Sequence, residues 1–427
     1  MKVYADLHLH SPFSRATSEK MNPLDLVGFA KIKGLNLLGT GDALHPAWLS
    51  QLSLALEEVD GTGLYKARGA DENVLFLVEA EVETVHLYEG RVKRIHHVIF
   101  MPSLEVAEQL GEALSRYGDL ERDGRPTLTI KPSELVETIL GVDDRCLVFP
   151  AHAWTPWRSI FGSFSGVDSI EECYEDMAKR IYALETGLSS DPAMNWRVSR
   201  LDRFTLLSFS DSHSPWPWRL GRECTIFNLS KLSYKELIEA IRTGKVATLE
   251  VPPEYGKYHY SGHRECGVGP LSPAEASKLN YRCPVCSKPL TKGVEDRVEE
   301  LADRPSGFKP EKNMNYVKVL PLHEVISAAL KPGGMKSLQS KVVGELYENL
   351  VVKLGSEYNV LLHASYEELI QAAPREVAIA IIMVREGRYR IIPGYDGVYG
   401  KLELKVVQKG LEGFLDRCPC KGSYYFD

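Results

Sequence analysis

Two histidines stand two positions apart near the N-terminus, in the run Asp6-Leu7-His8-Leu9-His10. The residues Val3-Tyr4-Ala5 before them predict a strand, and residues two apart in a strand point to the same face. His8 and His10 therefore direct their imidazoles at one point, where the strand runs into a Ser-Pro turn. A surface pair would have the same spacing, but this arrangement can also hold a metal ion.

The same kinds of side chain recur at the ends of other predicted strands. A single histidine is more often an ordinary core or surface residue than a metal ligand, and we interpret His86 in this way. Seven strand–loop junctions that all contain His, Asp or Glu are not explained by coincidence. Burying so many ionisable groups without partners costs several kcal/mol each, and divalent cations remove that cost. The candidate ligands are His8, His10, Asp42, His45, Glu81, His96, His97, His152, Asp211 and His213, with Glu79 and Glu185 as further candidates.

Imidazole and carboxylate ligands without thiolate favour zinc, manganese or iron, and magnesium is a further possibility. About eight ligands suit two to three ions, because a catalytic zinc typically uses three protein ligands. Such ions lower the pKa of water towards neutrality, so hydrolysis needs no serine or cysteine nucleophile. We expect Asp211 and His213 to be catalytic. Asp191 either orients a substrate or joins the metal shell, or it only caps a helix that starts at Pro192.

A second metal motif lies further along the chain. His263 and Cys266 form one pair, and Cys283 and Cys286 form another, with sixteen residues between the pairs. This spacing is typical of a zinc ribbon, in which four protein ligands close a structural zinc site. His259 is an alternative fourth ligand. Cys418 and Cys420 have no partner pair, so we do not interpret them as a site.

The elements that position these residues alternate between strand and helix. Seven strands are expected up to residue 230, with helices between them, which predicts a parallel sheet closed into a distorted barrel. The fold class is therefore α/β, with the barrel over 1–245, a zinc-binding module over 250–312 and an α+β region over 313–427. The expected strands are Val3–Leu9, Leu35–Thr40, Val74–Val82, Ile95–Met101, Cys146–Ala151, Ile181–Glu185 and Phe204–Phe209.

The third region is less regular. Val342–Leu354 has helical periodicity, whereas the apolar runs Val377–Val384 and Tyr389–Ile392 are typical of strands. The segment 393–400, with the sequence PGYDGVYG, is rich in turn residues.

Composition excludes several classes of protein. With 44% hydrophobic and 26% charged residues, and no apolar run of eighteen residues or more, the 427-residue chain is expected to be cytoplasmic, without a signal peptide or a membrane partner. The net charge of −7 argues against coating of nucleic acid but permits a local basic face. Aromatic and arginine side chains near the expected mouth of the barrel predict DNA contacts through Trp154, Trp157, Arg158, Arg197, Arg200 and Arg222.

The motifs HLHSPFS, GTGD, AEVE, HHVIF, PAHAW and SDSH, in this order, resemble those of the PHP (polymerase and histidinol phosphatase) superfamily. The resemblance covers residues 1–230 and implies a distorted seven-stranded barrel with a trinuclear metal site that hydrolyses phosphoesters. It implies that His8, His10, Glu81, His96, His152, Asp211 and His213 are ligands, with Asp42 or His45 in the second motif. We prefer His96 to its neighbour His97. The acidic or histidine ligand that often follows the first motif is absent, because Ala16 and Thr17 stand there.

Further stretches, GLNLLGTGDALHP, ETGLSSDPAMNWR, SDSHSPWPWRLGRE, the GHREC–CPVC pair and PGYDGVYG, span nearly the whole chain. Together they resemble the endonuclease Q family of lesion-specific DNA repair nucleases from archaea and some bacteria. The resemblance implies incision 5′ of hypoxanthine, uracil and xanthine and at abasic sites, in single- or double-stranded DNA, with the damaged nucleotide extruded into a pocket. A sliding clamp is a further expected partner, although no clamp-binding peptide is recognisable. Two alternatives stay open: a PHP phosphatase acting on a small phosphomonoester such as histidinol phosphate, and a non-catalytic nucleic-acid-binding protein.

Overall fold

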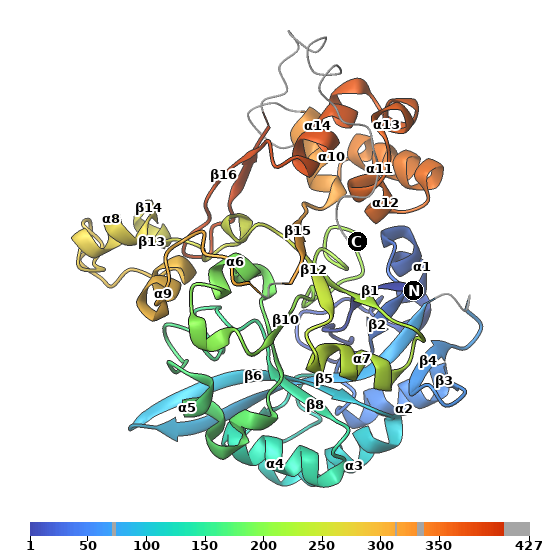
Figure 1. The fold of residues 1–427 in the computed structure, drawn as a ribbon, viewed down its shortest axis with the longest axis vertical. Coiled ribbons are helices and arrows are strands. Elements are labelled where there is room, and N and C mark those ends of the chain that lie inside the picture. Colours follow the sequence, from blue (N-terminus) through green and yellow to red (C-terminus); the bar gives the residue numbers. More distant parts are fainter. Residues whose placement is uncertain (71–73, 312–313, 331–336, 405–427) are drawn as a thin grey trace.

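The computed structural model describes residues 1–70, 74–311, 314–330 and 337–404. Figure 1 shows a barrel of strands with helices around it. A small module projects to one side of the barrel, and a group of helices lies above the barrel. The ring of barrel strands comprises β1 (Lys2–Asp6), β2 (Leu37–Gly39), β5 (Leu75–Tyr88), β6 (Arg91–Met101), β8 (Leu147–Pro150), β9 (Ala183–Glu185), β10 (Thr205–Leu207), β12 (Val246–Glu250) and β11 (Cys224–Asn228). The predicted α/β class is confirmed.

All seven strands expected from the sequence form, and β11 and β12 are additions that complete the ring. β1 pairs with β2 on one side and with β11 on the other, while β9 and β10 pair only with each other and contact β8 and β12. The ring is therefore nearly closed, but its hydrogen bonding is interrupted on both sides of β9 and β10.

The prediction of a parallel sheet is wrong for β6. β1, β2 and β5 run parallel, but β6 turns back from β5 as a long antiparallel hairpin, and β8 is antiparallel to β6. β11 is also reversed relative to β1. The short loop of Glu89 and Gly90, both with positive φ, makes the hairpin possible, because parallel neighbours would need a long crossover. The start of β6 thus lies at the same barrel end as the C-termini of β1, β2 and β8.

Helices cover the outside of the barrel (Figure 1). The first illustrates how the sequence sets their ends: Asn22 caps it, Pro23 is its first residue, and Gly34 ends it with φ of 100°. These helices are α1 (Pro23–Lys33), α2 (Pro46–Ala55), α3 (Leu104–Leu114), α4 (Pro132–Val142), α5 (Ile170–Tyr174), α6 (Pro192–Asn195) and α7 (Tyr234–Arg242). Strands β3 (Leu56–Val59), β4 (Leu64–Ala67) and β7 (Thr127–Leu128) extend the sheet beside β5.

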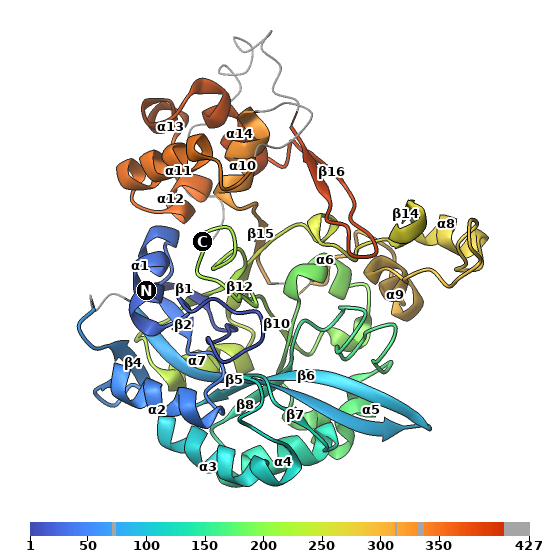
Figure 2. The same cartoon turned by 180° about the vertical axis from the view of Figure 1, so that it is seen from behind.

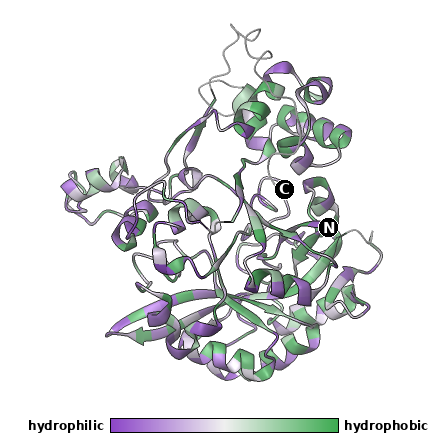
Figure 3. Ribbon diagram, viewed as in Figure 1, coloured by the Kyte–Doolittle hydropathy of each residue, from purple (hydrophilic) through white to green (hydrophobic). Residues whose placement is uncertain are grey.

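Burial of apolar side chains holds this arrangement together. One core cluster fills the barrel and includes Phe100, Phe149 and Phe209, whose rings contact one another edge-on or tilted. A larger cluster lies between the sheet and the helices and continues into the C-terminal helices. Figure 3 shows the corresponding hydrophobic colouring along the barrel strands.

The small module follows β12 and contains β13 (Ser261–His263), β14 (Val268–Leu271), α8 (Pro273–Lys278) and α9 (Val294–Leu301). After it the chain returns to the barrel sheet as β15 (Tyr316–Lys318), which pairs in parallel with β12 so that Thr248 lies opposite Tyr316. The module is therefore an insertion between two neighbouring strands of one sheet.

The C-terminal region is a helical group with one β-hairpin. It contains α10 (Leu322–Leu330), α11 (Lys341–Leu354), α12 (Glu357–Leu362), α13 (Tyr366–Ala372) and α14 (Arg375–Arg385), followed by β16 (Arg390–Ile392) and β17 (Lys401–Glu403). The strand expected at Val377–Val384 is wrong. That run is the buried part of α14, and a continuous apolar run has no period that separates a buried helix from a strand.

Two contacts place this region on the barrel. Lys33 at the end of α1 is buried and forms an ion pair with Glu357 of α12, with 2.8 Å between Nζ and Oε1. The β16–β17 hairpin reaches from the helices towards the small module, as the front and back views both show (Figures 1 and 2). Among the described helices, none combines the length and the apolar character that crossing a membrane requires.

Candidate active site

Polar side chains gather at the barrel end where β1, β2 and β8 finish and β6 begins. His8 and His10, two apart after β1, meet Glu81 from β5 and Asp211 from the loop after β10. One potential ligand atom from each of the four residues lies within 4.8 Å of all the others. His10 Nε2 is 3.0 Å from Asp211 Oδ1 and 3.4 Å from Glu81 Oε2. We call these residues cluster A.

A second group shares Glu81 with the first. His96 Nδ1 is 2.8 Å from Glu81 Oε1, and His152 Nε2 is 3.1 Å from the same oxygen. Glu81, His96 and His152 again bring their ligand atoms within 4.8 Å of one another, and we call them cluster B. The two oxygens of one buried carboxylate thus face two separate groups of imidazoles.

Other polar side chains hold the histidines in place. Glu185 lies 3.0 Å from His8 Nδ1, and Asp42 lies 3.0 Å from His10 Nδ1. The hydroxyls of Thr155 and Ser159 both lie 3.0 Å from His152 Nδ1. Each of these three rings therefore has one nitrogen directed into a cluster and the other fixed by an oxygen, which is the usual arrangement around metal-binding histidines.

The backbone at this end of the barrel is strained. Asp42, His152 and Asp211 all have positive φ, of 48°, 30° and 48°. Residues other than glycine rarely adopt this conformation, and such residues concentrate at functional sites, where surrounding contacts compensate for the strain. Here the compensation includes the hydrogen bonds that the Asp42 carboxylate accepts from the Ser11 backbone N–H and hydroxyl, both at 2.6 Å.

Charge complementarity shifts the titration of these groups. Burial lowers the pKa of His10, but Asp42 and Asp211 outweigh it and raise the pKa to about 10. Burial opposes ionisation of Asp211, yet His10 and His8 lower the pKa of its carboxyl. Burial likewise opposes ionisation of Glu81, and His96, Arg125 and His8 hold its pKa well below the ordinary value. Asp211 and Glu81 therefore favour the ionised form, which is the form that binds a metal ion.

The residues present fit divalent cations. His8 Nε2 is buried within cluster A and has no hydrogen-bond partner among the described residues. Imidazole nitrogens and carboxylate oxygens are ligands for zinc, manganese and iron. A cation in cluster A would give His8 Nε2 a partner, and Glu81 could bridge it to a second cation in cluster B.

Four of the ten sequence-predicted barrel ligands lie outside both clusters: His97, His45, Asp42 and His213. His97 faces the other side of β6, where it lies opposite Val82 and contacts Thr84 and the Tyr174 hydroxyl. His45 caps α2 and its Nε2 is 3.1 Å from the Glu121 carbonyl oxygen. Asp42 orients His10 instead of joining a cluster. These positions place His97, His45 and Asp42 outside the two clusters, and their role as ligands stays a prediction.

Asp191 and His213 also differ from their expected positions. Asp191 is buried, accepts a hydrogen bond from the Met194 N–H as the cap of α6, and pairs with Lys318 Nζ at 2.8 Å. It lies in neither cluster, so the helix-cap interpretation is correct and the catalytic one is not supported. His213 lies at the rim: its ring stacks on His10 at 4.2 Å, and its Nε2 is 3.8 Å from Asp211 Oδ1.

The residues expected to contact DNA divide into buried and exposed groups. Trp154 is a core residue whose Nε1 donates to Asn195, and Arg197 is buried and paired with Glu295 and Glu299. This corrects the expectation for both, because neither side chain is accessible. Trp157 is 39% exposed, while Arg158 and Arg200 are exposed. Arg222 is half-buried and donates to the Ser210 carbonyl oxygen.

Sequence reasoning missed Arg125, which lies next to the clusters. Its Nη1 is 3.0 Å from Glu81 Oε2. Arg125 also lines a cavity of about 750 Å³ together with four other arginines, Arg15, Arg94, Arg122 and Arg158, and three acidic residues, Glu83, Asp119 and Asp123. Only Arg122 and Arg125 share a loop, and the other three arginines are distant in sequence, so no spacing in the sequence indicates that the five converge.

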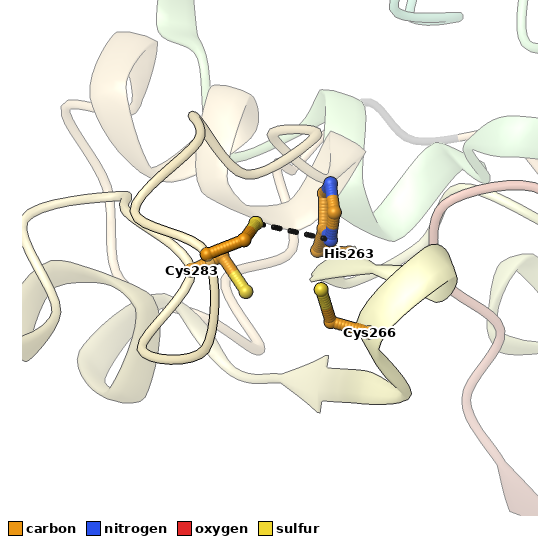
Figure 4. A group of neighbouring side chains, drawn as sticks. His263, Cys266 and Cys283 are labelled. Carbon is orange, nitrogen blue, oxygen red and sulfur yellow. Dashed lines mark hydrogen bonds between the residues drawn. The ribbon is translucent and has the colours of Figure 1, made fainter.

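The small module brings its four predicted zinc ligands together. His263, Cys266, Cys283 and Cys286 place their ligand atoms within 4.8 Å of one another, and Cys286 Sγ is 3.9 Å from His263 Nδ1. Figure 4 shows the side chains of His263, Cys266 and Cys283 pointing towards a common point. His259, the alternative ligand, is buried outside this group. Cys418 and Cys420 lie outside the described residues.

Comparison with known proteins identifies relatives along the whole chain. The domain family described as the MJ0043 C-terminal domain matches residues 321–388. The uncharacterised protein MJ0043 of Methanocaldococcus jannaschii is 36% identical over 266 residues, 60% of this chain, and the chain spans 32% of that protein's length. The uncharacterised protein YqxK of Bacillus subtilis is 30% identical over 426 residues, which are 94% of this chain and 99% of YqxK.

Two solved structures are similar over nearly the full length. The lesion-specific endonuclease PfuEndoQ of Pyrococcus furiosus has a TM-score of 0.85 and 33% identity, covering 97% of this chain and 99% of that one. Endonuclease Q in complex with a 27-mer duplex substrate, with an abasic lesion at the active site, has a TM-score of 0.83 and 34% identity, covering 95% and 97%. The chain therefore belongs to the family of lesion-specific endonucleases that includes the endonuclease Q of Pyrococcus furiosus.

Proposed function

We propose that this protein is a metal-dependent endonuclease that cuts the DNA backbone at damaged nucleotides. The observation that carries the proposal is the pair of histidine and carboxylate clusters that share Glu81 at the open end of the barrel. The similarity in sequence and fold to endonuclease Q, one structure of which contains an abasic lesion at its active site, supports DNA as the substrate.

In this proposal His8, His10, Glu81 and Asp211 hold one divalent cation, and Glu81, His96 and His152 hold a second. His213, at the rim of cluster A, is placed to meet the substrate or a further ion. Zinc, manganese, iron or magnesium bound there supplies Lewis acidity and lowers the pKa of water. The four ligands of the small module fill all positions around a structural zinc.

The protein's own side chains position the substrate. Arg125 lies beside the bridging carboxylate, so its guanidinium can hold a non-bridging oxygen of the phosphate that enters the site. The other arginines of the 750 Å³ cavity can bind neighbouring phosphates. Trp157 stacks on Phe164 with ring centroids 4.9 Å apart and offers an exposed aromatic face for an unpaired base.

The finer substrate assignment is incision on the 5′ side of hypoxanthine, uracil, xanthine and abasic sites. These lesions share a weakened or absent base pair, so extruding the nucleotide costs less than it does for an undamaged pair.

The test is incision of 5′-labelled duplexes that carry one deoxyinosine, one deoxyuridine or one abasic site, with an undamaged duplex as control. We expect cutting at the lesions only, loss of cutting after chelation, and recovery when zinc, manganese or magnesium is returned. Glu81→Gln should abolish cutting, whereas Glu348→Gln on the exposed face of α11 should not. A protein that hydrolyses a chromogenic phosphomonoester but leaves every duplex intact would contradict the proposal and favour a small-molecule phosphatase.

A further inference from the structure

The segment 153–168 lies between His152 and α5 and contacts both histidines of cluster B. Two of its hydroxyl groups lie 3.0 Å from His152 Nδ1. The carbonyl oxygen of Arg158, in the same segment, accepts a hydrogen bond of 3.0 Å from the His96 backbone N–H. The conformation of one loop therefore bears on the position of both histidines.

The histidines of cluster A are held by other parts of the chain. Asp42, which follows β2, orients His10, and Glu185, at the end of β9, orients His8. A displacement of the segment 153–168 is therefore expected to weaken a cation in cluster B more than a cation in cluster A.

Arg297 of α9 holds this segment from the side of the small module. Its guanidinium donates to the carbonyl oxygens of Phe161 at 3.1 Å and of Val167 at 3.2 Å, and it forms an ion pair with Asp168. The Arg297 side chain is 13% exposed, so water competes little for these bonds. One side chain of the small module thus joins two separate points of a barrel loop.

Hydrogen bonds inside the segment transmit this constraint to His152. The N–H of Phe161 donates at 2.9 Å to the carbonyl oxygen of Ala153, the residue after His152. The N–H of Val167 donates to the Ile160 carbonyl oxygen at 2.7 Å. His152 has a φ of 30°, which its surroundings must enforce because a residue other than glycine rarely adopts it.

The helix α9 is also connected to the zinc ligands of the small module. The Ser261 hydroxyl donates at 2.7 Å to Asp296, the residue before Arg297, and accepts from the Gly293 N–H at 2.9 Å. Ser261 begins β13, and His263, one of the four ligands, ends it. A continuous series of contacts therefore leads from the four zinc ligands through α9 to cluster B.

We propose that Arg297 is a positioning residue for the second cation, and that the small module acts through it to keep the segment 153–168 in the conformation that binds this cation. The proposal rests on the cation-binding role of cluster B in the proposed function. It gives the zinc of the small module a task at the metal centre, because that zinc fixes the strand to which α9 is bonded.

Manganese titration of the full-length protein, prepared with zinc in the small module only, tests the proposal. Manganese prefers carboxylate oxygen to thiolate, so it leaves the zinc of the module in place. We expect calorimetry to show two manganese ions in the wild type. Arg297→Met keeps an extended side chain without donors, and it should weaken one of the two ions by about 10- to 100-fold.

Lys292→Met is the matched control. It removes an ion pair between Lys292 and Glu300 that stays within the small module, so it should bind both ions as the wild type does. Arg297→Lys keeps the charge but presents a single nitrogen in place of the planar guanidinium, so it should weaken the same ion by a smaller factor.

Incision of a duplex with one abasic site gives a second readout. Weaker binding of one ion should raise the manganese concentration for half-maximal kcat by the same factor as calorimetry shows. At saturating manganese, kcat of the Arg297→Met protein should return to the wild-type value, because added metal compensates for lost affinity. Added metal does not restore a protein that is damaged in its fold or in its contact with DNA.

The outcomes separate the proposal from the function on which it rests. Unchanged manganese affinity in a folded Arg297→Met protein would overturn the role of Arg297, as would a loss of incision that no manganese concentration restores. If the Met variant does not fold, unchanged affinity in Arg297→Lys has the same meaning. A wild type that binds two manganese ions but cuts no duplex contradicts the proposed function, and calorimetry alone then decides the role of Arg297.

Discussion

Glu81 shows how much of the site a single residue type can reveal. A glutamate inside an apolar strand is expected to have a partner, and the sequence predicted a metal. One of its oxygens faces cluster A and the other faces cluster B. Glu83 and His96 lie directly opposite each other on β5 and β6, and Glu81 lies on the same face of β5 as Glu83. That register selects His96 and turns His97 away. Residue types therefore indicated the chemistry, while strand pairing decided which of two adjacent histidines takes part.

Spacing alone could not separate ligands from the residues that orient them. Asp42 and Glu185 follow strand ends as residues of the two clusters do, yet each lies 3.0 Å from the outer nitrogen of a histidine. At the same barrel end, a shift of a few ångströms in the position of a carboxylate separates a cluster residue from a residue that orients a histidine. No motif or periodicity in the sequence indicated Arg125, because it lies in an irregular loop.

Asp42→Asn tests the orienting role. The amide keeps the size of the side chain but removes the charge that fixes the His10 ring, so we expect metal affinity of the barrel site to fall by about 10- to 100-fold. Metal titration followed by calorimetry measures this change. Asp60→Asn, at an exposed position, is the control and should bind metal as the wild type does. Unaltered affinity in a folded Asp42→Asn protein would show that Asp42 does not orient His10.

At the scale of elements, strand order along the chain was predictable, but strand direction was not. Apolar runs predicted seven of the barrel strands but not β11 and β12, and the β6 reversal depends on a two-residue turn without a strong sequence signal. The helix α14 was mistaken for a strand because burial on all sides removes periodicity. The zinc ligands were predictable because the motif itself fixes their spacing.

β12 carries a buried carboxylate that makes stability depend on pH. Burial, with a smaller contribution from Asp191, raises the pKa of Glu250 to about 8. In the unfolded chain a glutamate loses its proton near pH 4.3. Between these values the native protein binds more protons than the unfolded one, so the free energy of unfolding falls as pH rises, by up to about 1.4 kcal/mol per unit.

Glu250→Gln should remove that dependence, because an amide is neutral at every pH. We expect urea midpoints measured at pH 5, 6.5 and 8 to decline less steeply than in the wild type, with the largest gain in stability at pH 8. Glu239→Gln, on the exposed face of α7, should retain the wild-type slope. Parallel slopes for the Glu250 variant and the wild type would contradict the assignment.

The small module should contain one zinc ion that depends on its cysteines. We expect Cys283→Ser to lose one equivalent of zinc by elemental analysis and to melt at a lower temperature, because four ligands close a structural site. The control is Cys146→Ala, which also changes a buried cysteine. Cys146 precedes β8 and lies away from the module, so this variant should retain the zinc of the wild type. Equal zinc content in both variants would show that the cysteine cluster binds no metal.

At the scale of the whole molecule, the C-terminal helices are fixed to the barrel by an ion pair that is nearly inaccessible to water. Lys33 is 1% exposed, and besides Glu357 its Nζ donates to the Pro217 carbonyl oxygen at 2.6 Å. Glu357 also accepts from the Tyr347 hydroxyl and the Leu322 N–H. No sequence pattern indicated that residues 324 positions apart would meet.

Lys33→Met should destabilise the protein by about 3–5 kcal/mol, because it leaves the Glu357 charge buried and unpaired. Urea unfolding measures the loss. Lys33→Met combined with Glu357→Gln should recover part of it, since the double variant has no buried charge at this point. Lys235→Met on the exposed face of α7 should change stability by less than about 0.5 kcal/mol. A single variant as stable as the wild type would show that the pair does not hold the two regions together.

The parallel pairing of β15 with β12 has a consequence for protein engineering. The chain leaves the C-terminal end of β12, forms the small module and re-enters the sheet at the start of β15, so the C-terminal helices follow directly from the barrel sheet. A crossover of about a dozen residues would satisfy the same connection. A shortened chain would still need new partners for buried Arg197, which pairs with Glu295 and Glu299 of the module, and for Asp396, which accepts from the Arg264 N–H and the Thr291 hydroxyl.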